Sequence, residues 1–68
     1  MAFDSYYLNE NADIEGDNEM HRLGCSKMPK NKLYVGTFST CREALSEAKK
    51  MLSTADGCAF CCPNCHTS

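Results

Sequence analysis

Two segments of the chain carry side chains at spacings that suit a shared metal ion. One presents the imidazole of His21 and the thiol of Cys25 from a short H-x₃-C motif. The other holds two consecutive C-x-x-C pairs, Cys58 with Cys61 and Cys62 with Cys65. A C-x-x-C turn places two thiolates at the right separation to share one tetrahedral zinc ion, and its backbone amides can donate to the sulfurs. One such pair supplies half of a site, and the H-x₃-C motif can supply the other half.

The remaining cysteines and the second histidine have other expected roles. The stretch 58–65 holds more cysteines than a half-site needs, so two of them are expected to be buried, to lie beside the ligands or to be redox-active. Cys41 falls on the apolar face of a predicted helix, where a free cysteine behaves as a small hydrophobic residue. His66 is expected to be an uncoordinated residue in a frayed segment.

Hydrophobic periodicity predicts the elements that must position these residues. Strands are expected over 3–8, 19–23 and 33–38, the last with Leu33, Val35 and Thr37 on one face and Tyr34, Gly36 and Phe38 on the other. A helix is expected over 41–53, because Thr40 and Glu43 have the spacing of a capping box and apolar residues recur at helical intervals. Gly57 is expected to end that segment. The sequence therefore predicts a small α+β fold, with a two- or three-stranded antiparallel sheet, one packed helix and a cysteine-rich C-terminal knuckle.

The length of the chain limits how stable such a fold can be. Its 68 residues are expected to form a single small domain over 1–68. A chain of this size buries only about 60% of the surface that it exposes when extended, and the gain from burial nearly cancels the loss of conformational entropy. The chain has 6 cysteines and no tryptophan. We therefore expect a bound metal or disulfides to supply the stability that the core cannot.

Charge and hydropathy exclude several classes of partner. The net charge is −2; residues 1–19 carry only acidic charges, and residues 20–41 carry only basic ones. An overall basic field for nucleic acid is missing, although the basic segment could form a local patch. No apolar run approaches the ~18 residues of a membrane span. The N-terminal residues lack the charged and apolar regions of a signal peptide, so we expect a cytoplasmic protein with reduced thiols.

The order of motifs resembles two groups of proteins. His21-x₃-Cys25, a strand ending at Phe38, and a final G-C-x-x-C resemble the zinc-binding domain of the Ada methylation-repair protein over about residues 20–65, and also small modules found on some bacterial nucleases. Nearly the whole chain resembles a family of small stand-alone bacterial proteins of unknown function. The shared motifs are Tyr6-Tyr7-Leu8-Asn9, Gly16-Asp17-Asn18-Glu19-Met20-His21, Val35-Gly36-Thr37-Phe38 with Cys41, Glu43-Ala44 and Gly57-Cys58.

The resemblance to the Ada domain implies a ligand set. By position, His21 and Cys25 become the first pair of zinc ligands, with an imidazole in place of one thiolate. Gly57 directly before Cys58 favours Cys58 and Cys61 as the second pair. Pro63 and a link of sufficient length keep Cys62 and Cys65 as alternates. The methyl-transfer activity of Ada is not carried over, because a histidine occupies one upstream position and the basic patch is weak.

Taken together, these features favour a non-catalytic, zinc-stabilised binding module whose partner is a protein or a nucleic acid. One alternative is a thiol-disulfide redox protein, although both C-x-x-C pairs follow the helix and do not begin it. Another is a secreted domain held by disulfides, for which six cysteines allow fifteen pairings. No set of residues for general enzymatic catalysis can be picked out, so we do not expect an enzyme.

Overall fold

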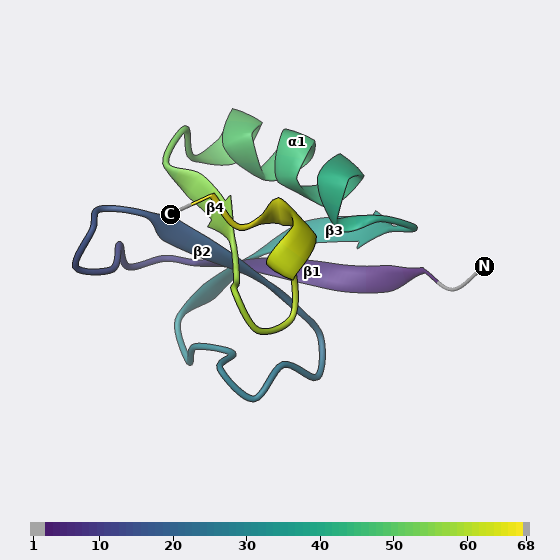
Figure 1. The fold of residues 1–68 in the computed structure, drawn as a ribbon, viewed down its shortest axis with the longest axis horizontal. Coiled ribbons are helices and arrows are strands. Elements are labelled where there is room, and N and C mark those ends of the chain that lie inside the picture. The colour runs from purple at the N-terminus through teal and green to yellow at the C-terminus, as the bar shows by residue number, and fades with distance from the viewer. Residues whose placement is uncertain (1–2, 68) are drawn as a thin grey trace.

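The fold is a four-stranded sheet covered on one face by a single helix. The computed structural model describes residues 3–67. The elements, in chain order, are β1 (Asp4–Asn9), β2 (Asn18–Arg22), β3 (Lys32–Phe38), α1 (Cys41–Met51), β4 (Ala55–Gly57) and one turn of 3-10 helix, η1 (Pro63–Cys65). The strand order in the sheet is β3-β1-β2-β4 (Figure 1). The predicted α+β class with one packed helix is confirmed, but the sheet has four strands where two or three were expected.

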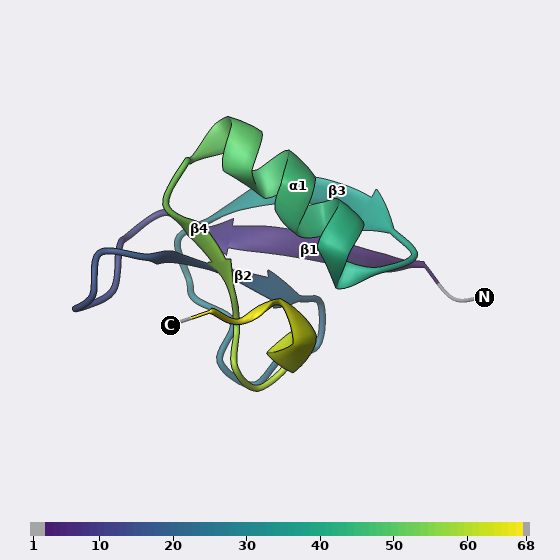
Figure 2. The same ribbon diagram turned by 45° about the horizontal axis from the view of Figure 1, so that its top comes forward.

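Alternate side chains of β1 and β2 point to the same face of the sheet, and helix α1 packs on the face that carries the apolar ones. Helix α1 lies on one side of the sheet, and the loop that joins β2 to β3 lies on the other (Figures 1 and 2). Tyr6 and Leu8 of β1 and Met20 of β2 are buried together with Ala44 and Ala48 of α1. Alanine at the contact positions of the helix contributes little side-chain volume to this core. Within residues 3–67, no helix is both long enough and apolar enough to cross a membrane.

A bulge changes the predicted faces of β3. The register between β1 and β3 shifts between Tyr6 and Tyr7, so that Tyr7 lies opposite Tyr34 and Tyr6 opposite Gly36. Beyond this point Thr37 shares a face with Tyr34, whose hydroxyl lies 2.8 Å from the Thr37 hydroxyl. The side chain of Phe38 instead packs against the core. The prediction for Thr37 and Phe38 is therefore wrong, because one extra residue in a strand moves all later side chains to the opposite face.

Helix α1 begins with the predicted capping box. The hydroxyl of Thr40, the N-cap residue, accepts a hydrogen bond from the Glu43 backbone N–H at 3.2 Å. The Glu43 carboxylate in turn accepts from the hydroxyls of Ser39 and Thr40. These hydrogen bonds, the one from Ser39 first, lower the pKa of the Glu43 side chain. The helix ends at Met51, two residues before the predicted end, because the chain turns there toward β4.

Replacement of the N-cap should weaken the helix measurably. We expect Thr40→Ala to lower the free energy of unfolding by about 1 kcal/mol, because the Glu43 N–H then loses its acceptor at the helix N-terminus. Thr40→Ser keeps the hydroxyl and is the matched control. Urea denaturation of both variants measures the effect. A shift in the serine variant as large as that in the alanine variant would contradict the capping role.

Strand β4 was not predicted, and it changes the topology. Its three residues pair in parallel with β2, with Ala55 opposite Asn18 and Gly57 opposite Met20. Gly57 was expected to end the helical segment, but the chain leaves the helix at Leu52 and Gly57 closes a strand instead. A side chain at Gly57 would lie 2.8 Å from the backbone of Cys65. The missing side chain therefore allows the segment after β4 to fold back over it.

Candidate metal centre

The parallel pairing of β2 and β4 brings the two halves of the predicted site together. Neighbouring parallel strands end at the same edge of a sheet, and here His21 follows Met20 as Cys58 follows Gly57. The Cys58 N–H donates to the Met20 carbonyl at 2.9 Å, which continues the pairing by one step. After β2 the chain turns at Gly24, whose φ of 96° is in the left-handed region that favours glycine. This turn brings Cys25 back toward the end of β4.

Four side chains from these two segments form one cluster. One nitrogen of His21 and the sulfurs of Cys25, Cys58 and Cys61 all lie within 4.8 Å of one another. The Sγ atoms of Cys25 and Cys58 are 3.9 Å apart. Two sulfurs bound at about 2.3 Å to a tetrahedral zinc ion would be about 3.8 Å apart. This cluster could hold a metal ion, and the separation of the Cys25 and Cys58 sulfurs fits one.

His21 has the features of a metal-ligating imidazole. Its side chain is 2% exposed, and its Nδ1 atom has no hydrogen-bond partner. An unpaired buried nitrogen costs free energy, and a metal ion at this position would remove that cost. The other nitrogen, Nε2, lies 3.6 Å from the Glu19 carboxylate, the kind of outer contact that orients a ligating histidine. Burial lowers the pKa of His21, with Glu19 acting in the opposite direction, so the imidazole is held in its neutral form.

Backbone amides point at three of the sulfurs, as they do around bound metal ions. These contacts are Lys27 N–H to Cys25 Sγ at 3.4 Å, Phe60 N–H to Cys58 Sγ at 3.4 Å and Arg22 N–H to Cys61 Sγ at 3.2 Å. Burial acts to raise the pKa of Cys25, but hydrogen bonds, with that from Lys27 the largest, outweigh it and lower the pKa. Burial dominates at Cys61 and raises its pKa far above the usual range, so a thiolate there needs a cation beside it.

The alternate ligand pair lies outside the cluster. Cys65 forms a disulfide with Cys41, with the two Cα atoms 6.4 Å apart, and this bond joins η1 to α1. The expectation that Cys41 is a free buried thiol is therefore wrong, and so is the expectation of reduced thiols for Cys41 and Cys65. Cys62 is a free, buried cysteine whose Sγ lies 3.7 Å from that of Cys61. The residues thus separate into one cluster of possible ligands and one disulfide, whereas the sequence left a metal and disulfides as alternatives.

His66 is held in place and does not belong to the cluster. Its Nδ1 lies 2.9 Å from the Gly57 carbonyl oxygen and 3.5 Å from the Asp56 carboxylate. Asp56 is buried and also accepts hydrogen bonds from the backbone N–H and the hydroxyl of Thr67. These contacts hold residues 66 and 67 along β4, where the sequence had suggested a frayed segment.

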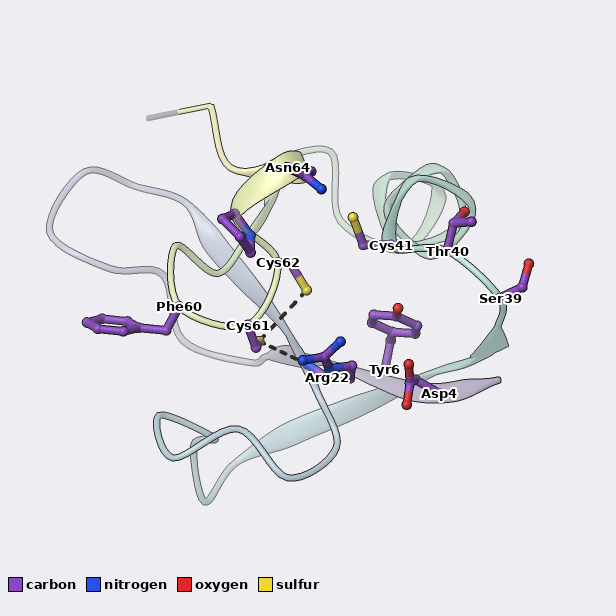
Figure 3. Close-up of a pocket in the computed structure, with 11 residues that line it drawn as sticks. Asp4, Tyr6, Arg22, Ser39, Thr40, Cys41, Phe60, Cys61, Cys62 and Asn64 are labelled. Atoms are coloured by element: carbon purple, nitrogen blue, oxygen red, sulfur yellow. Dashed lines mark hydrogen bonds between the residues drawn. The ribbon is translucent and has the colours of Figure 1, made fainter. Parts of the chain in front are cut away.

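A pocket that the sequence did not suggest lies next to the cluster (Figure 3). Its volume is about 500 Å³, and it lies between β1, the end of β2, the start of α1 and residues 60–64. Tyr6, Arg22 and Cys61 are among the residues that line it. Cys61 therefore belongs to both the cluster and the pocket wall. No local pattern marks these residues, because they come from four separate segments.

A second group of possible oxygen ligands occurs in the loop between β1 and β2, formed by Asp13, Glu15 and Asp17. One carboxylate oxygen of Asp13 already accepts hydrogen bonds from the backbone N–H groups of Glu15 and Asp17, each at 2.9 Å. This arrangement is that of a polar turn. The His21, Cys25, Cys58 and Cys61 cluster is therefore the candidate functional site. No protein-family model, no curated protein and no solved structure matches this chain.

Proposed function

We propose that this chain is a non-catalytic binding module whose fold is held by one zinc ion. Nδ1 of His21 and the sulfurs of Cys25, Cys58 and Cys61 are the ligands in this proposal. The observation that carries it is the convergence of these four groups within 4.8 Å, together with a buried His21 Nδ1 that has no protein partner. The resemblance of the H-x₃-C and G-C-x-x-C motifs to the Ada zinc-binding domain supports the same ligands.

The donor set favours zinc over other common metals. Three sulfurs and one imidazole nitrogen are soft or borderline donors, which disfavour magnesium and calcium. A tetrahedral site of this composition is typical of structural zinc. Four protein ligands would fill the tetrahedron, whereas catalytic zinc sites keep one position open for water or substrate. This closed ligand set is why we propose a structural role for the ion.

Two exposed apolar side chains support a binding role. Phe60 stands between Cys58 and Cys61 and is 73% exposed, with the Lys27 ammonium 4.9 Å from the centre of its ring. Leu23 stands between His21 and Cys25 and is 62% exposed. A bound ion would fix both turns, so it would present these side chains to a partner at little entropic cost. The proposed partner is a protein or a nucleic acid, and the proposed location is the cytoplasm.

Metal content tests the proposal directly. We expect about one zinc per chain by elemental analysis of protein purified under reducing conditions, because four ligands complete one tetrahedral site. Cys58→Ser should carry almost no zinc. Cys62→Ser is the matched control, since it changes a buried cysteine one residue from Cys61 and should keep a full complement. Cobalt substitution should give the visible spectrum of a tetrahedral ion bound by three thiolates. Zinc retained by Cys58→Ser and lost by Cys62→Ser would overturn the ligand assignment.

A further inference from the structure

The two cysteines of the disulfide differ in burial: Cys41 is partly exposed and Cys65 is buried. Cys41 lines the pocket of about 500 Å³. Cys65 is only 8% exposed and is not part of the pocket wall. In Figure 3 the sulfur of Cys41 points away from the helix, toward the segment that holds Cys62 and Asn64. Thiol-disulfide exchange requires an entering sulfur to reach one of the two bonded sulfurs, so a small thiol in this pocket meets Cys41 first.

The pocket wall carries one positive and one negative side chain that are available to a ligand. These are Arg22 and Asp4, and neither makes an ion pair with another residue in the part of the chain that the structure describes. The Tyr6 side chain lies beside them in Figure 3. Tyr6 as a residue is 3% exposed. Within residues 3–67 its hydroxyl makes no hydrogen bond, yet the hydroxyl is not fully enclosed, because the enclosed side-chain atom without a partner in this range is His21 Nδ1. A hydroxyl that lines a pocket and has no protein partner can bind a polar group of a ligand.

We propose that this pocket admits a small thiol bearing both a carboxylate and an ammonium group, and that Cys41 is a site of reversible modification by such a thiol. The carboxylate lies against the Arg22 guanidinium and the Tyr6 hydroxyl, and the ammonium group lies against Asp4. This inference goes beyond the zinc-binding role and uses no metal chemistry, because neither Cys41 nor Cys65 belongs to the proposed ligand set. It shares with that role only the fold, to which Cys61 contributes a side chain in the pocket wall.

The exchange balances without any further oxidant or reductant. The thiolate of the small molecule attacks Cys41 Sγ, the bond between Cys41 and Cys65 breaks, and Cys65 leaves as a thiolate that takes up a proton. The product is a mixed disulfide on Cys41. A second small thiol then attacks the outer sulfur of that mixed disulfide and releases Cys41 as a thiol. In sum, two small thiols are oxidised to their disulfide while the protein disulfide is reduced to two thiols.

Four small thiols test the charge requirement separately at each end of the ligand. Cysteine carries both charges, N-acetylcysteine only the carboxylate, cysteamine only the ammonium group and 2-mercaptoethanol neither. The full chain is mixed with each thiol, quenched with acid at short times and alkylated. Mass spectrometry of the intact chain and its peptides then gives the rate and the position of modification, with each rate divided by the thiolate concentration of the probe.

We expect cysteine to react fastest, about fivefold faster than either singly charged thiol, in line with the strength of one partly exposed ion pair. The mixed disulfide should form on Cys41. Arg22→Gln should remove the advantage of cysteine over cysteamine, and Asp4→Asn its advantage over N-acetylcysteine. Lys50→Gln changes an exposed charge outside the pocket wall and should leave all four rates unchanged.

Three results would overturn the inference. The first is equal rates for all four thiols, because the two charges of the pocket would then play no part. The second is a mixed disulfide on Cys65. The third is an Arg22→Gln variant in which all four rates change by the same factor, since that would indicate a general effect on the fold.

Discussion

Removal of the metal ion is expected to unfold the chain. The proposed ligands join residues 21–25 to residues 58–61. Between them lies a small core in which Leu8, Met20, Ala44 and Ala48 have no exposed surface. A domain of this size typically has an unfolding free energy of roughly 3–10 kcal/mol, at about 0.05–0.15 kcal/mol per residue. Structural zinc sites contribute apparent free energies of about 10–16 kcal/mol. The contribution of the ion is thus as large as the whole expected stability.

A chelator titration followed by circular dichroism measures this effect. The far-ultraviolet signal of helix and strand should be lost as zinc is withdrawn and should return when zinc is added back. Cys25→Ser should behave like the chelated protein even when zinc is present. Ser26→Ala, a change at the next residue, should behave like the unaltered chain. Metal-free protein with an unchanged amide spectrum would show that the core and the disulfide hold the fold without the ion.

Loss of the disulfide between Cys41 and Cys65 is expected to have the next largest effect. The bond closes a loop with a sequence separation of 24. In the chain-entropy description, a crosslink of this length stabilises the native state by about 3 kcal/mol, because it restricts the unfolded chain. We therefore expect the double variant Cys41→Ala/Cys65→Ala to unfold at a clearly lower urea concentration than the oxidised protein, with zinc present in both samples.

Treatment with a reductant provides a second measurement of how much the disulfide stabilises the native state. A dithiol that is too weak a chelator to remove zinc should lower the urea midpoint of the unaltered chain to near that of the double variant. The same reductant should leave the double variant unchanged. Cys62→Ala serves as the control for the loss of a buried sulfur without the loss of a crosslink. An equal response to reductant in the double variant would assign the effect to thiols other than Cys41 and Cys65.

Local patterns in the sequence were sufficient for most of the secondary structure. The helix could be predicted because the Thr40 and Glu43 capping contacts and the spacing of Ala44 and Ala48 all lie within a few turns of one element. The strands around Leu8, Met20 and Leu33 were visible for the same reason. Strand β4 was not, because three residues ending in glycine carry no periodic signal and owe their conformation to pairing with β2.

Of the candidate site, too, the sequence could indicate the residues within local motifs but not the contacts between distant segments. The spacing of the motifs offered two competing C-x-x-C pairs, and the resemblance with Gly57 favoured Cys58 and Cys61 beside His21 and Cys25. The structure brings these four together, while their binding of zinc stays a prediction. The disulfide could not be predicted, because Cys41 and Cys65 are distant in sequence and meet only after Gly57 lets the chain fold back. The pocket could not be predicted for a related reason. The strand order is what makes neighbours of Asp4, Arg22 and the residues after Phe60.

The parallel pairing of β2 and β4 also means that the four proposed ligands lie close together only in the folded chain. Cys25 and Cys58 are 33 residues apart in the chain, so an unfolded molecule offers an ion only one close pair at a time. On the proposed zinc binding, such a molecule would hold the ion far more weakly than the native one, and the folded fraction would rise with the concentration of free zinc. In a cell starved of zinc, most copies would be unfolded and open to proteolysis. The abundance of this protein would then follow the zinc supply without a dedicated regulator.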